Sequence, residues 1–189
     1  MGNIWLTSDL HLNHDRPFIY EARGFETIDE MNEKLVENFN EMIEDEDILY
    51  ILGDIMLGNK DEEGIELVRS IKGHKHLIAG NHDTPRRLAA YKEAGIFESI
   101  QYALPLVVGK WHYFLSHYPM LTMNNDTRPD VVSLYGHSHQ FENWKEETPW
   151  QTSSMYNVGV DAHNLKPVDI RDIKVKIREQ IEIDKQEVR

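Results

Sequence analysis

Several short apolar runs in this sequence end in polar residues of one chemical kind, and this pattern constrains the fold more than any other feature. A short apolar run bounded by turn residues is typical of a buried strand. The runs cover residues 4–8, 47–52, 76–79, 111–116 and 131–135. The polar residues that follow them are Asp9 and His11, Asp54, Asn81 and His82, His117, and His137 and His139. Ligands of open α/β proteins bind where the carboxyl ends of strands meet. The sequence therefore predicts an α/β fold that gathers these side chains at one sheet edge.

Helices are predicted between the first strands. Thr27 begins a capping-box pattern, which indicates a helix to about residue 44. A second helix is predicted over residues 61–71, closed by Gly73, and a third over residues 85–94, with Pro85 at its first position. The apolar side chains expected to face the sheet from this third helix are Leu88, Ala89 and Tyr91. The alternation of strands and helices predicts parallel pairing.

In the second half of the chain, the predicted strands no longer alternate with helices. Residues 96–108 and 111–116 indicate two strands joined in a hairpin, and residues 154–160 indicate another strand. Segments 122–130 and 140–152 are rich in polar residues and Pro, and we expect surface loops there that border the site. The tail from Pro167 shows both a helical and an alternating pattern. A helix is favoured by the spacing of Ile170, Ile173, Ile177 and Ile181.

Length, charge and cysteine content exclude several classes. We expect residues 1–189 to form a single domain, since this length can bury a sizeable core. The chain has no Cys, so a metal site must use His, Asp, Glu or Asn. A net charge of -13 disfavours nucleic acid as a partner. The sequence has neither the pattern of a secretory signal nor an apolar run long enough to span a membrane. We therefore expect a cytoplasmic protein without a membrane partner.

The spacing of the polar residues favours metal binding. Asp9 and His11 are two positions apart, as are His137 and His139, so in extended backbone each pair would point to the same side. Carboxylate and imidazole groups suit divalent transition metals. Asn157 lies on the last predicted strand and Asp161 at its end, and we expect them to support the ligating histidines.

The motifs D-x-H, G-D, G-N-H-D, a lone His and G-H-x-H occur in this order between Asp9 and His139. In this the chain resembles the calcineurin-like metallophosphoesterase superfamily. Its first motif, which carries the additional His14, is similar to that of small bacterial and phage members. The resemblance implies a four-layer α/β/β/α sandwich of two mixed sheets flanked by helices.

The resemblance also implies two divalent metal ions. Mn²⁺ is the expected metal, and Fe, Zn, Ni or Co are also compatible with these ligands. Asp54 would bridge the two ions. The ligands implied for the first are Asp9, His11, Asp54 and His139, and those implied for the second are Asp54, Asn81, His117 and His137.

Hydrolysis of a phosphate ester is the implied chemistry, with a metal-bridging hydroxide attacking in line. We expect His82 to act as the general acid and Asp83 to orient its ring, although Asp83 could also begin the following helix. Gly80 is expected to permit a tight turn. The residues expected to contact the substrate phosphate are His14, Arg16 and Asn81.

The sequence therefore predicts a dinuclear metal-dependent phosphoesterase acting on a small phosphodiester or phosphomonoester. A diester is favoured because a general acid suits a poor alkoxide leaving group. Two alternatives stay open: a non-catalytic metal-binding scaffold of the same fold, and a metal-dependent nuclease. The natural substrate, the native metal and the oligomeric state are not determined by the sequence.

Overall fold

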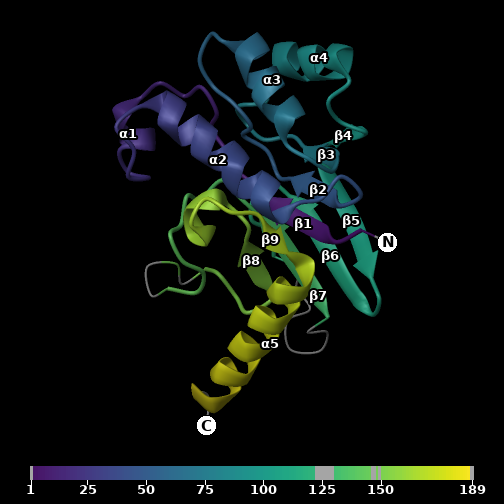
Figure 1. The fold of residues 1–189 in the computed structure, drawn as a ribbon. Coiled ribbons are helices and arrows are strands. Elements are labelled where there is room, and N and C mark those ends of the chain that lie inside the picture. Colours follow the sequence, from purple (N-terminus) through teal and green to yellow (C-terminus); the bar gives the residue numbers. More distant parts are fainter. Residues whose placement is uncertain (1, 122–129, 146–147, 149, 188–189) are drawn as a thin grey trace.

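Two β-sheets form the centre of the molecule in a computed structural model, which describes residues 2–121, 130–145, 148 and 150–187 (Figure 1). The first sheet has the strand order β4-β3-β2-β1-β9 and the second has the order β5-β6-β7-β8. The strands of the first sheet are β1 (Ile4–Thr7), β2 (Ile48–Ile51), β3 (His74–Ile78), β4 (Ser99–Gln101) and β9 (Val168–Asp169). Those of the second are β5 (Ala103–Val108), β6 (Trp111–Ser116), β7 (Val131–Tyr135) and β8 (Met155–Asn157).

Both sheets are mixed. In the first, β1 to β4 pair in parallel and β9 runs antiparallel to β1. In the second, β5 and β6 form the predicted antiparallel hairpin, whereas β6, β7 and β8 are parallel. The parallel strands of each sheet therefore end at a common edge, and the parallel pairing of β1 to β3 is as the sequence predicts. The expectation of one sheet edge is corrected, because β6 and β7 belong to the second sheet.

Three helices cover the first sheet: α2 (Ile28–Met42), α3 (Asp61–Ser70) and α4 (Pro85–Ala94). The Thr27 side chain caps α2 by accepting a hydrogen bond from the Glu30 amide, and Gly95 ends α4 in the left-handed conformation. One core cluster joins these helices to the sheet, and it includes Leu35, Phe39, Ile51, Val68 and Tyr91.

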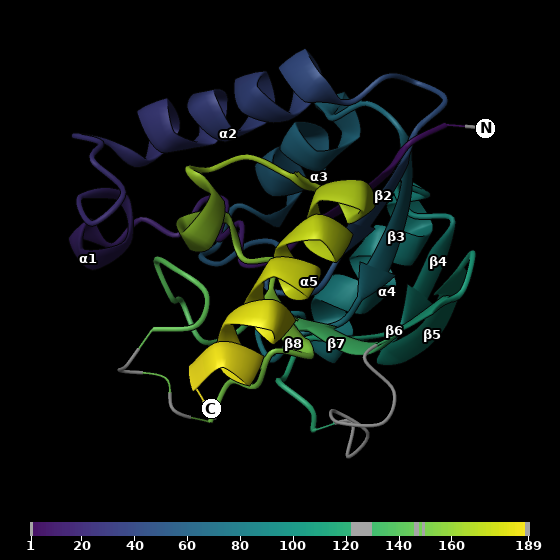
Figure 2. The same ribbon diagram turned by 90° about the horizontal axis from the view of Figure 1, so that it is seen from below.

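A second core cluster lies between the sheets. The first sheet contributes Leu6 and Ile78, and the second contributes Tyr113 and Leu134. Helix α5 (Ile170–Glu187) adds apolar side chains to this cluster and lies against β8 (Figure 2). The helical interpretation of the tail is therefore confirmed, as is the expected fold of two mixed sheets with flanking helices. Two short helices, α1 (Pro17–Tyr20) and η1 (Val160–His163), complete the described elements.

Some local predictions are wrong. Residues 96–108 do not form one strand, because β4 belongs to the first sheet and β5 to the second. Ala89 is exposed, whereas Arg87 is buried because its guanidinium bonds to Asp61 and to backbone carbonyls. Helix α3 ends at Ser70, with Ile71 rather than a glycine as its C-cap.

Most of the predicted loop 122–130 lies outside the described residues. Within the described part of the chain, every helix is too short or too polar to cross a lipid bilayer.

Candidate metal centre

The loops after β1, β2, β3, β6 and β7 bring the predicted site residues together. The first two loops are bound to each other through their backbones: the Asp9 amide donates to the Gly53 carbonyl at 3.0 Å, and the His11 amide donates to the Asp54 carbonyl at 3.1 Å. From the second sheet, the His137 amide donates to Asp9 Oδ2 at 2.9 Å. Backbone hydrogen bonds within the first sheet, and one backbone-to-carboxylate hydrogen bond between the two sheets, thus fix the relative positions of the loops.

One cluster consists of Asp9, His11 and His139, each of which offers a ligand atom within 4.8 Å of the others. The Nε2 atoms of His11 and His139 are 3.2 Å apart, although 128 residues separate them in the sequence. Asp9 Oδ1 lies 3.9 Å from His139 Nε2. Two of the predicted motifs therefore meet here.

A second cluster consists of Asp54, His117 and His137, again with ligand atoms within 4.8 Å of one another. His137 Nδ1 is 3.2 Å from His117 Nε2, and Asn81 Oδ1 is 2.8 Å from that same nitrogen. Asp54 lies between the clusters, because its Oδ2 atom is 3.9 Å from His11 Nε2 and 3.5 Å from His117 Nε2.

The donor atoms of both clusters fit a cation. His117 Nδ1 lies 2.8 Å from the Leu52 carbonyl and donates to it. In the neutral ring Nε2 then carries a lone pair and faces the Asn81 oxygen, which is also an acceptor. In the other cluster, the buried Asp9 Oδ1 has no hydrogen-bond partner among the described residues. Acceptors that face one another without a shared proton are satisfied by a metal ion.

Protonation favours the same conclusion. Burial, with His139 and Arg23 nearby, lowers the pKa of His11 to about 2, so this ring is neutral and offers a lone pair. Burial also raises the pKa of Asp9, which indicates a carboxylate that lacks sufficient compensating positive charge.

The backbone at these positions is unusual. Positive φ angles occur at Asp9 (59°), His11 (52°), Asp54 (55°), His137 (68°) and His139 (47°). Such left-handed residues each cost about 1–3 kcal/mol and cluster at functional sites. The expectation that Asp9 and His11 converge through extended backbone is therefore wrong, because left-handed turns direct both D-x-H and G-H-x-H side chains.

Two glycines permit close approach of these loops. A Cβ atom at Gly80 would lie 2.3 Å from Asp54 Oδ1, and one at Gly136 would lie 2.5 Å from Asp9 Oδ2. Gly80 therefore makes room for a carboxylate, rather than supplying the unusual turn geometry that the sequence suggested.

Asp83 has a different environment from the one predicted. Its carboxylate accepts hydrogen bonds from the backbone amides of Gly80 (2.8 Å) and Asp54 (2.9 Å), and it is buried. The Tyr91 hydroxyl also contacts it, at 3.4 Å. The prediction that Asp83 orients the His82 ring is corrected: its carboxylate is occupied by backbone amides and ties the loops after β2 and β3 together.

His82 itself lies beside the centre. Its amide donates to Asp54 Oδ1 at 2.9 Å, and its Nε2 atom is 3.8 Å from Asp54 Oδ2. The side chain is 40% exposed, so it can exchange protons with solvent. The ring is therefore within reach of a ligand held between the two clusters.

Sequence reasoning missed Arg23, which has a buried side chain and no motif around it. Its guanidinium binds Asp161 with Nε–Oδ1 at 2.8 Å and Nη2–Oδ2 at 3.2 Å, and it also donates to the Leu10 and Asp9 carbonyls. Asp161 accepts from His139 Nδ1 at 2.8 Å, which confirms the expected support for a candidate ligand. Asn157 instead contacts Ser138, Gln140 and the Gly159 amide.

This chain of contacts directs His139 Nε2 toward the first cluster. Burial alone would raise the pKa of Asp161, but hydrogen bonds from His139 and Arg23 outweigh burial and hold it at about 2. The same bond raises the pKa of His139 and fixes Nδ1 as its donor nitrogen.

A cleft of about 510 Å³ opens beside the first cluster. His14 lines it together with His11, His82 and His139, and the His14 ring lies 5.4 Å from that of His11. His14 is thus placed where the sequence predicts a substrate contact. Arg16 is exposed at the N-cap of α1 and is not among the described residues that line this cleft.

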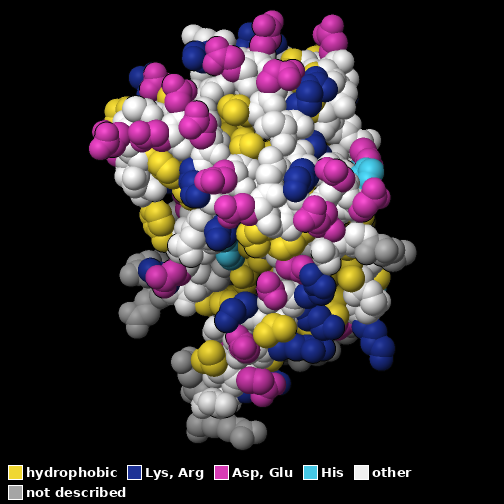
Figure 3. Space-filling view, viewed as in Figure 1, with side chains coloured by type: hydrophobic (Ala, Val, Ile, Leu, Met, Phe, Trp, Pro, Cys, Tyr) yellow, Lys and Arg dark blue, Asp and Glu magenta, His cyan; other side chains and the backbone are white. Residues whose placement is uncertain are grey.

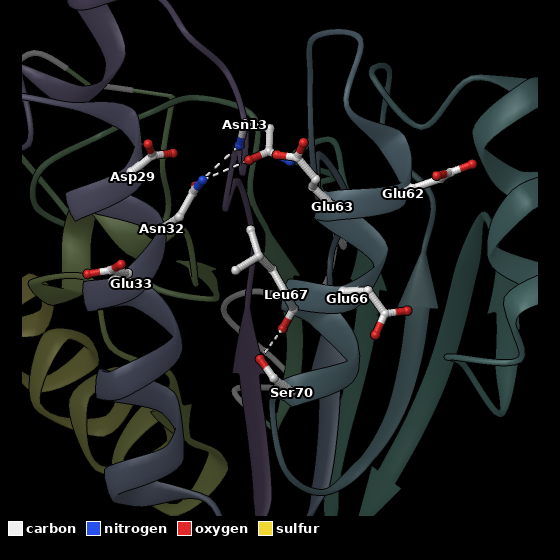
Figure 4. Close-up of a pocket in the computed structure, with 9 residues that line it drawn as sticks. All are labelled: Asn13, Asp29, Asn32, Glu33, Glu62, Glu63, Glu66, Leu67 and Ser70. Carbon is white, nitrogen blue, oxygen red and sulfur yellow. Dashed lines mark hydrogen bonds between the residues drawn. The ribbon is translucent and has the colours of Figure 1, made fainter.

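Another cleft, of about 670 Å³, separates α2 from α3 (Figure 4). The two asparagines at its centre bond to each other, with Asn32 Nδ2 donating to Asn13 Oδ1 at 2.7 Å. The carboxylates around it belong to Asp29, Glu33, Glu62, Glu63 and Glu66. Asp and Glu side chains are also spread over this face of the molecule (Figure 3). Such a lining repels phosphate, so this cleft is not a candidate for a phosphate ester.

Stacked mixed sheets with two neighbouring clusters of carboxylate and imidazole at one edge define an α/β protein with a candidate dinuclear metal centre. More specifically, the chain belongs to the calcineurin-like phosphoesterase family, whose model matches residues 2–169. Members of this family typically bind two metal ions.

Known relatives extend over the same length. The chain is 34% identical to the uncharacterized protein MJ1445 of Methanocaldococcus jannaschii, over 95% of this chain and 93% of that protein. It is 28% identical to the Gene 66 protein of Mycobacterium phage D29, over 95% and 99% of the two chains. The crystal structure of the protein of unknown function AQ665 from Aquifex aeolicus shares the fold, with a TM-score of 0.67 and 21% identity over 92% of this chain and 98% of that one.

Proposed function

We propose that this chain is a metal-dependent hydrolase of a small phosphate ester, with a diester favoured over a monoester. The observation that carries the proposal is the pair of clusters around Asp54, with the His82 ring beside them. Asp9, His11 and His139 would hold one ion; His117, His137 and Asn81 would hold the other, and Asp54 would contact both. Bound divalent ions would activate water and polarise the phosphoryl oxygens.

The role of His82 follows from its position and exposure. When the oxygen of a water molecule adds to phosphorus, the water releases one proton to solvent and the bond from phosphorus to the leaving oxygen breaks. The leaving oxygen then needs a proton. His82 can donate it from the ring and recover a proton from solvent. A diester is favoured because its alkoxide leaving group depends on this proton.

Other side chains would position the substrate. His14 lies in the same cleft as His82, and its Nδ1 atom has no hydrogen-bond partner among the described residues. Asn81 Oδ1 is held against His117, which leaves its amide group for a phosphoryl oxygen. Arg16 is exposed at the start of α1 and would act only on a substrate that extends from the cleft.

The test compares hydrolysis of diesters by protein loaded with Mn²⁺. His82→Ala should lower kcat by about 10²–10⁴-fold while two bound ions per chain are retained. The loss should be larger for methyl phenyl phosphate than for methyl 4-nitrophenyl phosphate, because phenolate is the more basic leaving group. His112→Ala is the matched control, since His112 is exposed on β6 and outside both clusters.

Two results would count against the proposal. If the loaded protein hydrolyses neither monoesters nor diesters, a non-catalytic metal-binding scaffold is the better interpretation. If metal analysis finds fewer than two ions per chain, the dinuclear assignment fails. Hydrolysis of single-stranded or duplex DNA at a rate above that of small diesters would instead identify a nuclease.

A further inference from the structure

Besides four histidines, the 510 Å³ cleft is lined by apolar and aromatic side chains. Phe18 on α1 and Phe141, which follows the G-H-x-H loop, both line it, as do Ile19 and Leu57. The volume lies in the range of small-molecule sites. The cleft therefore has one face suited to a metal-bound phosphate and another suited to an organic group.

Both phenylalanines are exposed. Phe18 is 68% exposed and Phe141 is 59% exposed, and they come from segments more than a hundred residues apart. Exposed aromatic side chains that border a cleft indicate a binding surface more often than a packing defect. The Phe18 ring meets the His14 ring edge to face at 5.6 Å, with an interplanar angle of 87°, so its orientation is set by a neighbour.

Charge limits what this face can bind. Of the lining residues that the structure describes, Arg23 is the only Lys or Arg. Its guanidinium is already bonded to Asp161 and to two backbone carbonyls, and its side chain is 3% exposed. A second phosphate or a carboxylate on the substrate would find no available cation here. The organic group is therefore not anionic.

His82 lines the same cleft, which determines the side of the phosphate that occupies it. We propose that the cleft binds the leaving alcohol of the substrate, and that this alcohol carries a flat aromatic ring without an anionic group, stacked on Phe18 and Phe141. This inference rests on the proposed function, because it uses His82 as the proton donor to the leaving oxygen. It adds the chemical class of the group that leaves.

The experiment uses two matched ligands, methyl benzyl phosphate and methyl cyclohexylmethyl phosphate, which share their reacting atoms and differ in ring planarity. Each is measured with Mn²⁺-loaded protein as a competitor of bis(4-nitrophenyl) phosphate hydrolysis. The benzyl compound should bind about 5- to 10-fold more tightly, as expected for one aromatic stacking contact. Phe18→Leu and Phe141→Leu should each remove most of that preference and leave binding of the cyclohexylmethyl compound within twofold.

Tyr102→Leu is the control, because Tyr102 is 76% exposed and does not line this cleft. Equal binding of the two compounds, tighter binding of the cyclohexylmethyl compound, or an unchanged preference in both Leu variants would overturn the assignment while hydrolysis of the reporter still supports the proposed function. Absence of reporter hydrolysis by metal-loaded protein would instead refute the proposed function itself.

Discussion

Asp161→Asn tests the contact that joins the buried core to the candidate metal centre. Both side chains of the Arg23–Asp161 pair are nearly inaccessible, at 3% and 6% exposed. The pKa of Asp161 falls from 3.8 to about 2, a shift worth about 2 kcal/mol by linkage. Leaving a buried charge without its partner costs about 3–5 kcal/mol. We therefore expect the metal-free variant to lose about 2–4 kcal/mol of unfolding free energy at pH 7.

The pH dependence has a defined sign. Because the pKa of folded Asp161 is depressed, its contribution is complete above the unfolded pKa of 3.8 and is lost as the pH falls toward about 2. Because Asp161 also raises the pKa of His139, the contribution of that contact is fully present only below the unfolded His pKa of 6.5. The difference in unfolding free energy between wild type and Asp161→Asn should therefore grow as the pH falls from 7 to about 5 and shrink below about pH 4. Urea unfolding of metal-free protein across this range measures it.

Metal affinity is the second measurement. Removing a carboxylate that orients a metal-binding histidine typically weakens affinity by about 10–100-fold. Titration calorimetry with Mn²⁺ should show this loss in Asp161→Asn. Asp169→Asn is the matched control, because Asp169 is also a buried acid paired with an arginine, Arg171, but its partner is 71% exposed and neither residue belongs to a cluster.

A stable Asp161→Asn variant with wild-type Mn²⁺ affinity would show that the Asp161–His139 contact does not orient a ligand. Unchanged unfolding free energy at pH 7 would refute the reasoning about the buried ion pair.

Two further substitutions test the packing of the loops. Gly136→Ala would place a Cβ atom 2.5 Å from Asp9 Oδ2. We therefore expect thermal unfolding to show a loss of about 1–3 kcal/mol of unfolding free energy, and calorimetry to show at least about 10-fold weaker Mn²⁺ binding. Wild-type Mn²⁺ affinity would show that the loop can shift freely. Asp83 Oδ2 accepts the amides of Gly80 and Asp54, and Oδ1 accepts the Ile55 amide at 3.4 Å. Asp83→Asn replaces one of these two oxygens with an NH₂ group, and we expect a loss of about 1–3 kcal/mol and a lower kcat. The dependence of kcat on the leaving group should be the same in Asp83→Asn as in wild type. If it instead matches that of His82→Ala, Asp83 takes part in proton transfer.

The sequence was sufficient for features that depend on local chemistry. Polar residues after apolar runs identified the strand ends, and the capping pattern at Thr27 placed the start of α2 correctly. These features are local because strand burial and helix capping involve residues a few positions apart. Family motifs then indicated which side chains would gather, and the structure brings Asp9, His11 and His139 together as expected.

Local patterns were insufficient where the partner lies far away in the chain. Asp83 next to His82 suggested a dyad, but its carboxylate is occupied by the backbone of a loop 29 residues earlier. The extended geometry assumed for the D-x-H pair was wrong because contacts between loops hold these residues in the left-handed region.

The sequence by itself determined the composition of the candidate site and the strand ends at which it lies, because short motifs and strand periodicity encode both. Tertiary structure alone decided the partners: Arg23 reaches Asp161 across 138 residues, and Phe18 and Phe141 border one cleft. The physical reason is that these contacts depend on how the two sheets stack and how their loops meet, and no periodicity or spacing within one segment records that arrangement.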